Sequence, residues 1–231
     1  MIQLLPRASR RLWCVALVGA GVAFAPARAG APAARVVEVP FRPAFVRPAG
    51  GAEQPARAGQ LLTSTAVLRT SKPGRLQVQL GDGRQFRLGG DAVLRLEAGG
   101  LRLEKGQIIA WINPGQKGGS PLQIRTRVAT ASIVGTTVFI EASDDSLKVF
   151  SWEGQVRVDT DAGHRYTLSS GQQLSYSASG WAAPRRLSLA EATARRDKSL
   201  LLNGFTTPMD TLQVIERELG LGPVPAPAPQ P

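Results

Sequence analysis

The chain has 231 residues, with 28 basic and 17 acidic side chains, one histidine and one cysteine. Because the only cysteine, Cys14, lies in a segment expected to be removed, the mature chain is expected to lack disulfides, thiolate nucleophiles and cysteine metal sites. His164 stands alone beside a turn, and the sequence has no Gly-x-Ser-x-Gly motif, phosphate-binding loop or calcium-loop pattern. We therefore expect a protein that is not an enzyme and holds no metal or cofactor.

Residues 1–29 have the pattern of a secretory signal peptide. Three arginines precede an apolar stretch at 12–25, and Ala27-Arg28-Ala29 supplies the small-x-small cleavage pattern. The apolar stretch is shorter than the roughly 20 residues that span a bilayer, and no later segment is long and apolar enough. We expect a periplasmic or secreted protein with no transmembrane span in the mature chain.

Removal of the signal peptide changes the charge but not its sign. Four of the 28 basic residues and none of the 17 acidic residues lie in it, so the net charge falls from +11 to +7. For an exported protein, a positive charge favours anionic envelope polymers or lipid headgroups over nucleic acid as partners. The simpler interpretation of this positive charge is that the arginines are solvated on strand faces.

The next segment, residues 30–58, is rich in Ala, Pro and Arg and is interpreted as a linker. Within it, Val36-Val37-Glu38-Val39 could add an early edge strand. Residues 59–182 are expected to form a β domain, because apolar and polar side chains alternate in short runs between turn signals. Such spacing favours an all-β core, arranged as an antiparallel-rich sandwich, a jelly roll or a short solenoid, with one or two C-terminal helices.

Two hairpins are expected in the first half of the β domain. The turn Gly81-Asp82-Gly83 separates two alternating runs, of which the second is Gln85-Phe86-Arg87-Leu88. The repeated pattern Leu-Arg-Leu-Glu at 94–97 and 101–104 flanks Ala98-Gly99-Gly100, so the leucines should face the core and the charged side chains should pair across the strands. Ile108 to Ile112 is apolar throughout and should be buried on both faces, whereas 113–121 is expected to be an exposed loop.

In the second half, Val134 to Ile140 is apolar or small on both faces, which predicts a central strand with little water contact. Gly135-Thr136 within it is interpreted as a bulge or close backbone approach. Trp111 and Trp152 are interpreted as core residues with satisfied N–H groups, with sugar stacking as the alternative.

Residues 183–221 are expected to form a helical extension. Ser188 and Glu191 make a capping box at the start of the first helix. This helix should run to about Asn203, with Gly204 as a left-handed terminator. A second helix should start at Thr207-Pro208 and end at Gly220. Packing on the sheet or docking to another chain would both suit these helices. Deletion of 186–220 is expected to leave the β domain folded, and the Pro-rich tail 222–231 should be disordered or a spacer.

Between residues 60 and 178, short turn motifs contain Asp82, Gly83, Gly135, Thr136, Glu153, Gly154, Gly171 and Gln172. These motifs resemble the FecR domain family, and we expect the eight residues to be structural. The resemblance implies a domain outside the cytoplasmic membrane that senses an outer-membrane receptor and relays a signal to a sigma-factor regulator. That relay needs a cytoplasmic N-terminal region and a membrane helix. This chain has a signal-like segment instead, so we expect it to share only the family's ability to bind protein.

Two functions are therefore considered from the sequence. The first is a non-enzymatic extracytoplasmic binding or sensing module that engages an envelope protein, by strand addition or through a surface face. The second is a structural envelope protein that binds anionic polysaccharide or peptidoglycan through a basic strand face. The residues of that face would be Arg95, Arg102, Arg125, Arg127, Arg157 and Arg165.

Overall fold

A computed structural model of the protein describes residues 34–113 and 120–222. The expected signal peptide, the tail beyond Gly222 and most of the loop at 113–121 therefore lie outside the described residues. No helix within the described part of the chain combines the length and the apolar character that a membrane crossing requires.

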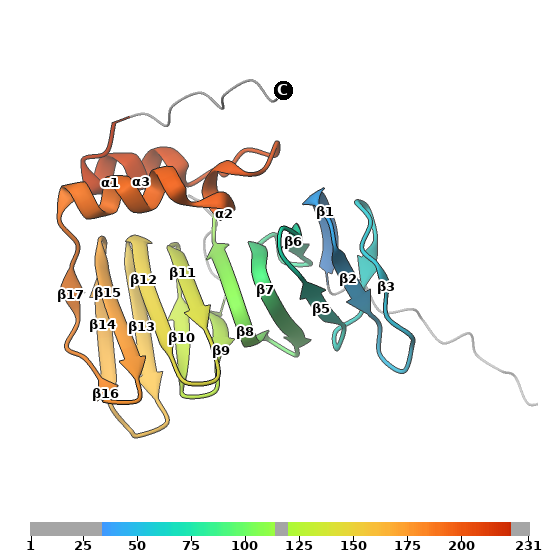
Figure 1. The fold of residues 1–231 in the computed structure, drawn as a ribbon, viewed down its shortest axis with the longest axis horizontal. Helices are drawn as coiled ribbons and strands as arrows, with labels where there is room; N and C mark the ends of the chain where they lie inside the picture. The colour runs from blue at the N-terminus through green and yellow to red at the C-terminus, as the bar shows by residue number, and fades with distance from the viewer. Residues whose placement is uncertain (1–33, 114–119, 223–231) are drawn as a thin grey trace, which may run out of the picture. The chain divides into compact units, whose positions relative to one another are not determined.

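Strands dominate the described residues, and three short helices follow them (Figure 1). The first strands are β1 (Ala34–Phe41), β2 (Ala44–Arg47), β3 (Gln54–Pro55), β4 (Leu61–Leu62), β5 (Val67–Thr70), β6 (Arg75–Leu80), β7 (Gln85–Glu97) and β8 (Gly100–Trp111). The later strands are β9 (Leu122–Arg125), β10 (Ala129–Ile133), β11 (Thr137–Ala142), β12 (Leu147–Glu153), β13 (Gln155–Thr160), β14 (Arg165–Ser169), β15 (Gln172–Ser177), β16 (Gly180–Trp181) and β17 (Arg185–Arg186).

The hydrogen-bonded strands form one continuous sheet that folds over on itself into two layers. The helix-side layer has the order β4-β1-β6-β7-β8-β11-β12-β15-β17. The open layer has the order β3-β2-β5-β7-β8-β9-β10-β13-β14. Among the described pairings only β8–β9 is parallel. The all-β, antiparallel-rich prediction is confirmed, and two packed layers correspond to the sandwich alternative.

The long hairpin β7–β8 belongs to both layers and bends between them. Its register shifts between Gly89 and Val93, and the bend is completed on β8 by Gly106 at φ +91°. A Cβ added to Gly106 would lie 2.3 Å from the Cα of Ala92. Only glycine fits here, because the backbone is left-handed and the facing strand leaves no room for a side chain.

The core lies between the two layers, and alternation along each strand decides which side chains enter it. On β8, Ile108 and Ala110 join the inter-layer core, whereas Ile109 and Trp111 face the helices. On the hairpin predicted from the Leu-Arg-Leu-Glu repeat, all four leucines are buried in the same core. Both predictions are confirmed, and part of the outer side of the helix-side layer forms a second core with the helices.

The interpretation of residues 30–58 as a linker is wrong from Ala34 onward. The strand considered for Val36 to Val39 is present as part of β1, but it lies between β4 and β6 in the helix-side layer instead of at an edge. β2 pairs with β5 in the open layer. Alternating Ala34 and Val36 are buried, at 2% and 0% exposure. Pro43 and Pro48 lie just outside strand ends, and Pro55 lies on the two-residue edge strand β3. Pro40 lies within β1, where the register with β6 shifts between Glu38 and Phe41.

The single strand predicted for Val134 to Ile140 is also wrong. β10 ends at Ile133 and β11 begins at Thr137, so Gly135 lies in the connection, at φ +63°. Val134 is 66% exposed. The apolar run misled the prediction because it joins the end of a strand, a left-handed turn and the start of the next strand.

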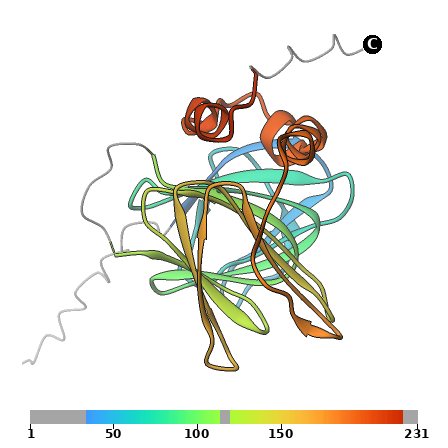
Figure 2. The same cartoon turned by 90° about the vertical axis from the view of Figure 1, so that its left-hand side faces the viewer.

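The three helices are α1 (Leu189–Lys198), α2 (Leu200–Asn203) and α3 (Leu212–Leu219), and they lie together on one side of the strands (Figures 1 and 2). The Ser188–Glu191 capping box is present. The predicted single helix to Asn203 is interrupted at Ser199, and Gly204 ends it at φ −95° rather than in the left-handed region. Gly220 ends α3 at φ +65°, as predicted.

The second helix begins later than predicted, at Leu212 instead of at Pro208. The amides of Thr206 and Thr207 each donate to the carboxylate of Glu38, at 2.9 Å. The carbonyl of Thr207 accepts a hydrogen bond from Arg87 Nη2 at 2.5 Å. Backbone groups that could have started a helix are therefore bound to side chains of the sheet.

Candidate functional site

Two of the motif turns meet in space, although 18 residues separate them in the sequence. The side chain of Thr136 accepts a hydrogen bond from the amide of Gln155 and donates one to its carbonyl, both at 3.1 Å. A Cβ on Gly154 would lie 2.6 Å from Thr136 Oγ1, so the two turns fit closely. Gly135 and Thr136 therefore hold the end of one hairpin against the next.

Glu153 is a buried carboxylate at the same place. Its side chain is 4% exposed, and its Oε1 lies 2.9 Å from Thr137 Oγ1, which in turn lies 2.7 Å from Thr211 Oγ1 at the cap of α3. Burial raises the pKa of Glu153 to about 7, the hydrogen bond from Thr137 opposes this, and the nearby charge of Glu218 raises it further. Glu153 thus links β11, β12 and α3.

The third motif turn joins the same cluster. The amide of Gly171 donates to the carbonyl of Ser151 at 2.8 Å, and Gln172 Oε1 accepts from the amide of Ser169 at 2.7 Å. Glu218 on α3 accepts from the amide of Gly154 at 3.0 Å and also contacts the hydroxyl of Ser170.

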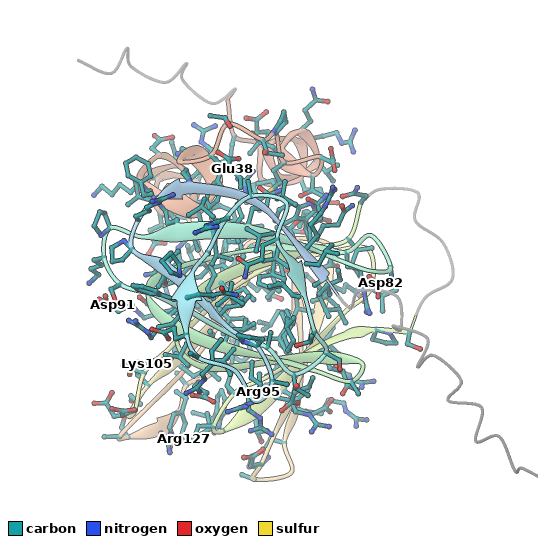
Figure 3. All side chains as sticks on the ribbon, turned by 90° about the vertical axis from the view of Figure 1, so that its right-hand side faces the viewer. Glu38, Asp82, Asp91, Arg95, Lys105 and Arg127 are labelled. Carbon is teal, nitrogen blue, oxygen red and sulfur yellow. The ribbon has the colours of Figure 1, made fainter. Side chains whose placement is uncertain are left out.

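Asp82 and Gly83 lie apart from this cluster, in the turn between β6 and β7. The amide of Arg84 donates to Asp82 Oδ1 at 3.1 Å, the two side chains form an ion pair, and Gly83 has φ +89°. Figure 3 shows Asp82 toward one side, away from Glu38 under the helices. Asp82 and Gly83 thus make the local contacts of a turn, and the structural role expected for the eight motif residues stays a prediction.

The six arginines of the proposed polymer-binding face do share one surface. Five lie on strands of the open layer, where Arg95 pairs with Arg102 and Arg102 with Arg125, and β10 separates these from Arg157 and Arg165. In Figure 3, Arg95 and Arg127 lie at the side opposite the helices. The strand order of the open layer, rather than sequence proximity, brings them together.

Acidic side chains partly neutralise this arginine face. The ion pairs are Arg95–Glu104 at 3.6 Å, Arg102–Glu97 at 2.7 Å, Arg125–Glu97 at 4.0 Å, Arg157–Asp159 at 2.9 Å and Arg165–Asp159 at 2.6 Å. Five of the six arginines thus have a carboxylate within 4.0 Å. The Arg95–Glu104 and Arg102–Glu97 pairs confirm the cross-strand pairing predicted for the Leu-Arg-Leu-Glu hairpin. The face is a mixed charged surface with an excess of positive charge, which screens easily with salt.

The two edges of the open layer differ in how they are protected. At one end, β3 has two residues, one of which is a proline, a common means of blocking strand addition. At the other end, β14 has five residues without proline, and it pairs with β13 and with no other described strand. The β14 edge is therefore the longer and less obstructed of the two.

The register shows which backbone groups β14 leaves outside the ladder. The amide of Thr160 donates to the carbonyl of His164 at 2.9 Å, and bonded and non-bonded pairs alternate in an antiparallel ladder. The backbone groups of Thr167 should consequently point away from β13. The amide of Ser169, two residues further, follows the same alternation and donates to a side chain instead of to β13. His164 itself is exposed in the turn.

Sequence reasoning missed Arg87, which alternation placed on a wet face. It is 1% exposed and donates to Gln77 Oε1 at 2.9 Å and to the carbonyls of Leu201 and Leu202 at 3.0 Å each. Its guanidinium also lies 4.3 Å from the ring centre of Phe205. Desolvation lowers the pKa of Arg87 to about 10 despite the charges of Glu38 and Asp210, which raise it. Arg87 fastens the helical segment to the sheet, and no local sequence signal marks that role.

Trp111 and Trp152 lie under the helices, at 0% and 1% exposure, so neither is a platform on the molecular surface. They pack as core residues, but their indole N–H groups have no acceptor among the described residues. The expectation that both N–H groups are satisfied stays a prediction.

Comparison with known proteins gives one family match. Residues 66–157 match the family described as FecR protein, which covers β5 to β12 and part of β13. Solved structures similar to this chain include two of a candidate anti-sigma factor from Parabacteroides distasonis ATCC 8503. One is 20% identical and covers 57% of this chain and 64% of its own, with a TM-score of 0.48. The other is 22% identical and covers 54% and 61%, with a TM-score of 0.45. This chain thus spans less than two thirds of either structure, and no curated protein matches it.

Proposed function

We propose that the protein is a non-enzymatic binding or sensing module for an envelope protein, on the premise that residues 66–157 match the FecR family. The signal-like residues 1–29 support an extracytoplasmic location, periplasmic or secreted. A mass measurement on the protein from the envelope fraction tests this location, with a mature chain that begins at Gly30 as the expected result.

The observation that carries the proposal is the edge strand β14. It is five residues long, lacks proline and pairs on one side only among the described strands. An extended peptide can add to such an edge through backbone hydrogen bonds, with alternate side chains giving specificity. The described edge strands of the helix-side layer, β4 and β17, have only two residues each and offer a shorter edge.

The test removes the outward-facing amide of β14 without disturbing its ladder with β13. Thr167→Pro deletes that donor, and proline is tolerated on an edge strand where its nitrogen faces solvent. Thr167→Val keeps the amide and the strand preference, so it is the matched control. Each variant is immobilised and exposed to envelope extract, and a defined protein should bind to wild type and to Thr167→Val but not to Thr167→Pro. Equal recovery by Thr167→Pro would contradict strand addition at this edge.

Binding of an anionic polysaccharide or peptidoglycan is the second candidate, favoured by the shared surface of the six arginines. It predicts retention that falls steeply as salt rises and that Arg125→Glu weakens. The local ion pairs argue against it, because they already satisfy most of these guanidinium groups. Salt-insensitive retention of one protein, unaffected by Arg125→Glu, would exclude this second candidate.

A further inference from the structure

The inter-layer core ends beside β14 in three half-buried aromatic side chains, Tyr166, Tyr176 and Trp181, which we call the aromatic seam. Tyr166 comes from β14 in the open layer, and the other two come from β15 and β16 (Figure 1). The ring centre of Trp181 lies 6.2 Å from that of Tyr166 and 5.1 Å from that of Tyr176. All three pack against the inter-layer core, yet each keeps part of its surface exposed. The apolar interior is therefore incompletely covered at this edge.

Alternation along β14 directs Tyr166 toward the space that an added strand would cover. Leu168, two residues further, is fully buried in the inter-layer core, and Tyr166 packs against the same core, so both side chains point inward. Arg165 and Thr167 are exposed on the solvent face. A strand added to β14 would also direct alternate side chains inward, and these would lie beside the aromatic seam.

The ladder with β13 decides which residue of an added strand comes closest to Tyr166. The hydrogen bond from the Thr160 amide to the His164 carbonyl, together with the register, places Arg165 and Thr167 in non-bonded pairs with β13. Their backbone groups therefore point toward an added antiparallel strand, and Tyr166 faces that strand in a non-bonded pair. The Cα atoms of such a pair are only about 4.5 Å apart, so the two side chains approach closely. An apolar residue opposite Tyr166 would cover the exposed part of the aromatic seam.

The solvent face of β13 and β14 carries two cations and one anion. Asp159 accepts a hydrogen bond from Arg157 at 2.9 Å and one from Arg165 at 2.6 Å, so two guanidinium groups share one carboxylate. The side chain of Arg165 is 69% exposed. A residue opposite Arg165 in an added strand would be its direct cross-strand neighbour, where opposite charge stabilises and like charge destabilises. A second copy of this chain, added through its own β14, would bring a further positive face, so charge complementarity favours an acidic partner.

We propose that the segment that adds to β14 is an acidic strand of alternating pattern, with an apolar side chain opposite Tyr166 and a carboxylate opposite Arg165. The apolar side chain extends the inter-layer core over the aromatic seam, and the carboxylate pairs with the guanidinium of Arg165. Backbone hydrogen bonds with Arg165 and Thr167 hold the register. This inference rests on the proposed function, because it specifies the partner that binds at the same edge.

Three fluorescently labelled peptides of about nine residues test the pattern by fluorescence anisotropy with the purified protein. The acidic peptide alternates glutamate with valine around a central tyrosine, the basic peptide has lysine in place of glutamate, and the polar peptide has serine in place of valine and tyrosine. The acidic peptide should bind at least about tenfold more tightly than the polar one and about fivefold more tightly than the basic one. No saturable binding of the acidic peptide would overturn the proposal. So would equal affinity for the polar peptide, which general attraction to a basic protein would produce.

Two charge reversals then locate the acidic contact. Arg165→Glu should lower the preference for the acidic over the basic peptide at least about fivefold. Arg95→Glu changes the net charge equally on a strand that β8, β9, β10 and β13 separate from β14, and it should change the preference by about twofold or less. Circular dichroism checks that both variants are folded. An equal effect of the two reversals would refute the pairing with Arg165.

Thr167→Pro separates a failure of this inference from a failure of the proposed function. If this variant no longer captures the envelope protein while the three peptides bind wild type alike, β14 accepts a strand and only the acidic, apolar pattern is wrong. If the acidic peptide binds Thr167→Pro as tightly as wild type, strand addition at this edge is wrong and the inference fails with it. Dimers of the protein alone that Thr167→Pro abolishes would place a second copy on β14 and overturn the acidic partner.

Discussion

Glu153→Gln should remove a pH dependence that the fold imposes on its own stability. Burial raises the pKa of Glu153 from 4.5 to about 7. Between those values the unfolded chain releases the Glu153 proton while the folded chain retains it. The folded state then binds more protons, so the free energy of unfolding falls as pH rises, and the contribution of Glu153 is fully present only below pH 4.5.

The magnitude follows from the size of that shift. One pKa unit corresponds to about 1.4 kcal/mol, so the difference between 4.5 and about 7 amounts to about 3 kcal/mol. Glutamine has nearly the same shape, its side-chain oxygen can still accept from Thr137, and it has no proton to lose in this range. The stability of Glu153→Gln minus that of wild type should therefore increase by about 3 kcal/mol from below pH 4.5 to above pH 7.

Urea denaturation followed by tryptophan fluorescence at a series of pH values measures this difference. The matched control is Glu104→Gln, which changes an exposed glutamate of the open layer and should give a curve parallel to that of wild type. If Glu153→Gln also runs parallel to wild type between pH 4.5 and 7, the buried carboxylate is not a proton-binding element of the folded state, and the reasoning from its burial is refuted.

Three further predictions concern stability. Gly106→Ala should lower the free energy of unfolding by about 4 kcal/mol or more, because the added Cβ overlaps the facing strand. Gly99→Ala should lower it by only about 1 kcal/mol, the cost of its left-handed backbone. Similar losses for the two variants in urea denaturation would contradict this prediction. Arg87→Met should lower the free energy of unfolding by about 3 to 5 kcal/mol, because four acceptors lose their donor. The control Arg35→Met changes an exposed arginine and should lower it by less than about 0.5 kcal/mol. A similar loss in both variants would refute the anchoring role of Arg87. Deletion of 186–220 should make the protein aggregate, as measured by size-exclusion chromatography, because it uncovers buried tryptophans. A monodisperse, folded product would show that the helices are dispensable.

That last prediction reverses the one made from the sequence, which treated the helices as an extension of a finished β domain. The sequence predicted that Ile108 to Ile112 is buried on both faces, but it did not show what covers the second face. Trp111, Phe150 and Trp152 on that face form a second core with Ile215 and other helix residues. The helices are therefore part of the packing that keeps the sheet dry.

The linker prediction failed for a related reason. Prolines and alanines between residues 30 and 58 give a weak strand signal, and strand pairing is decided by partners distant in the sequence. β1 finds its partners in β4 and β6, where Ala34 and Val36 enter the inter-layer core. No local pattern in this segment indicates that its backbone pairs with two other strands.

The sequence by itself determined the features that depend on neighbours along the chain. Alternation predicted the strands and the leucine hairpin, glycines predicted the turns, Ser188 and Glu191 predicted the capping box, and short motifs indicated the FecR domain. These are local because they rest on backbone conformation and on side chains a few residues apart. Only the tertiary structure decided which faces are covered and which groups lose contact with water. The burial of Arg87 and Glu153, the gathering of six arginines on one surface and the contact between Tyr166 and Trp181 all arise from long-range packing, because desolvation depends on what covers a residue and not on its position in the chain.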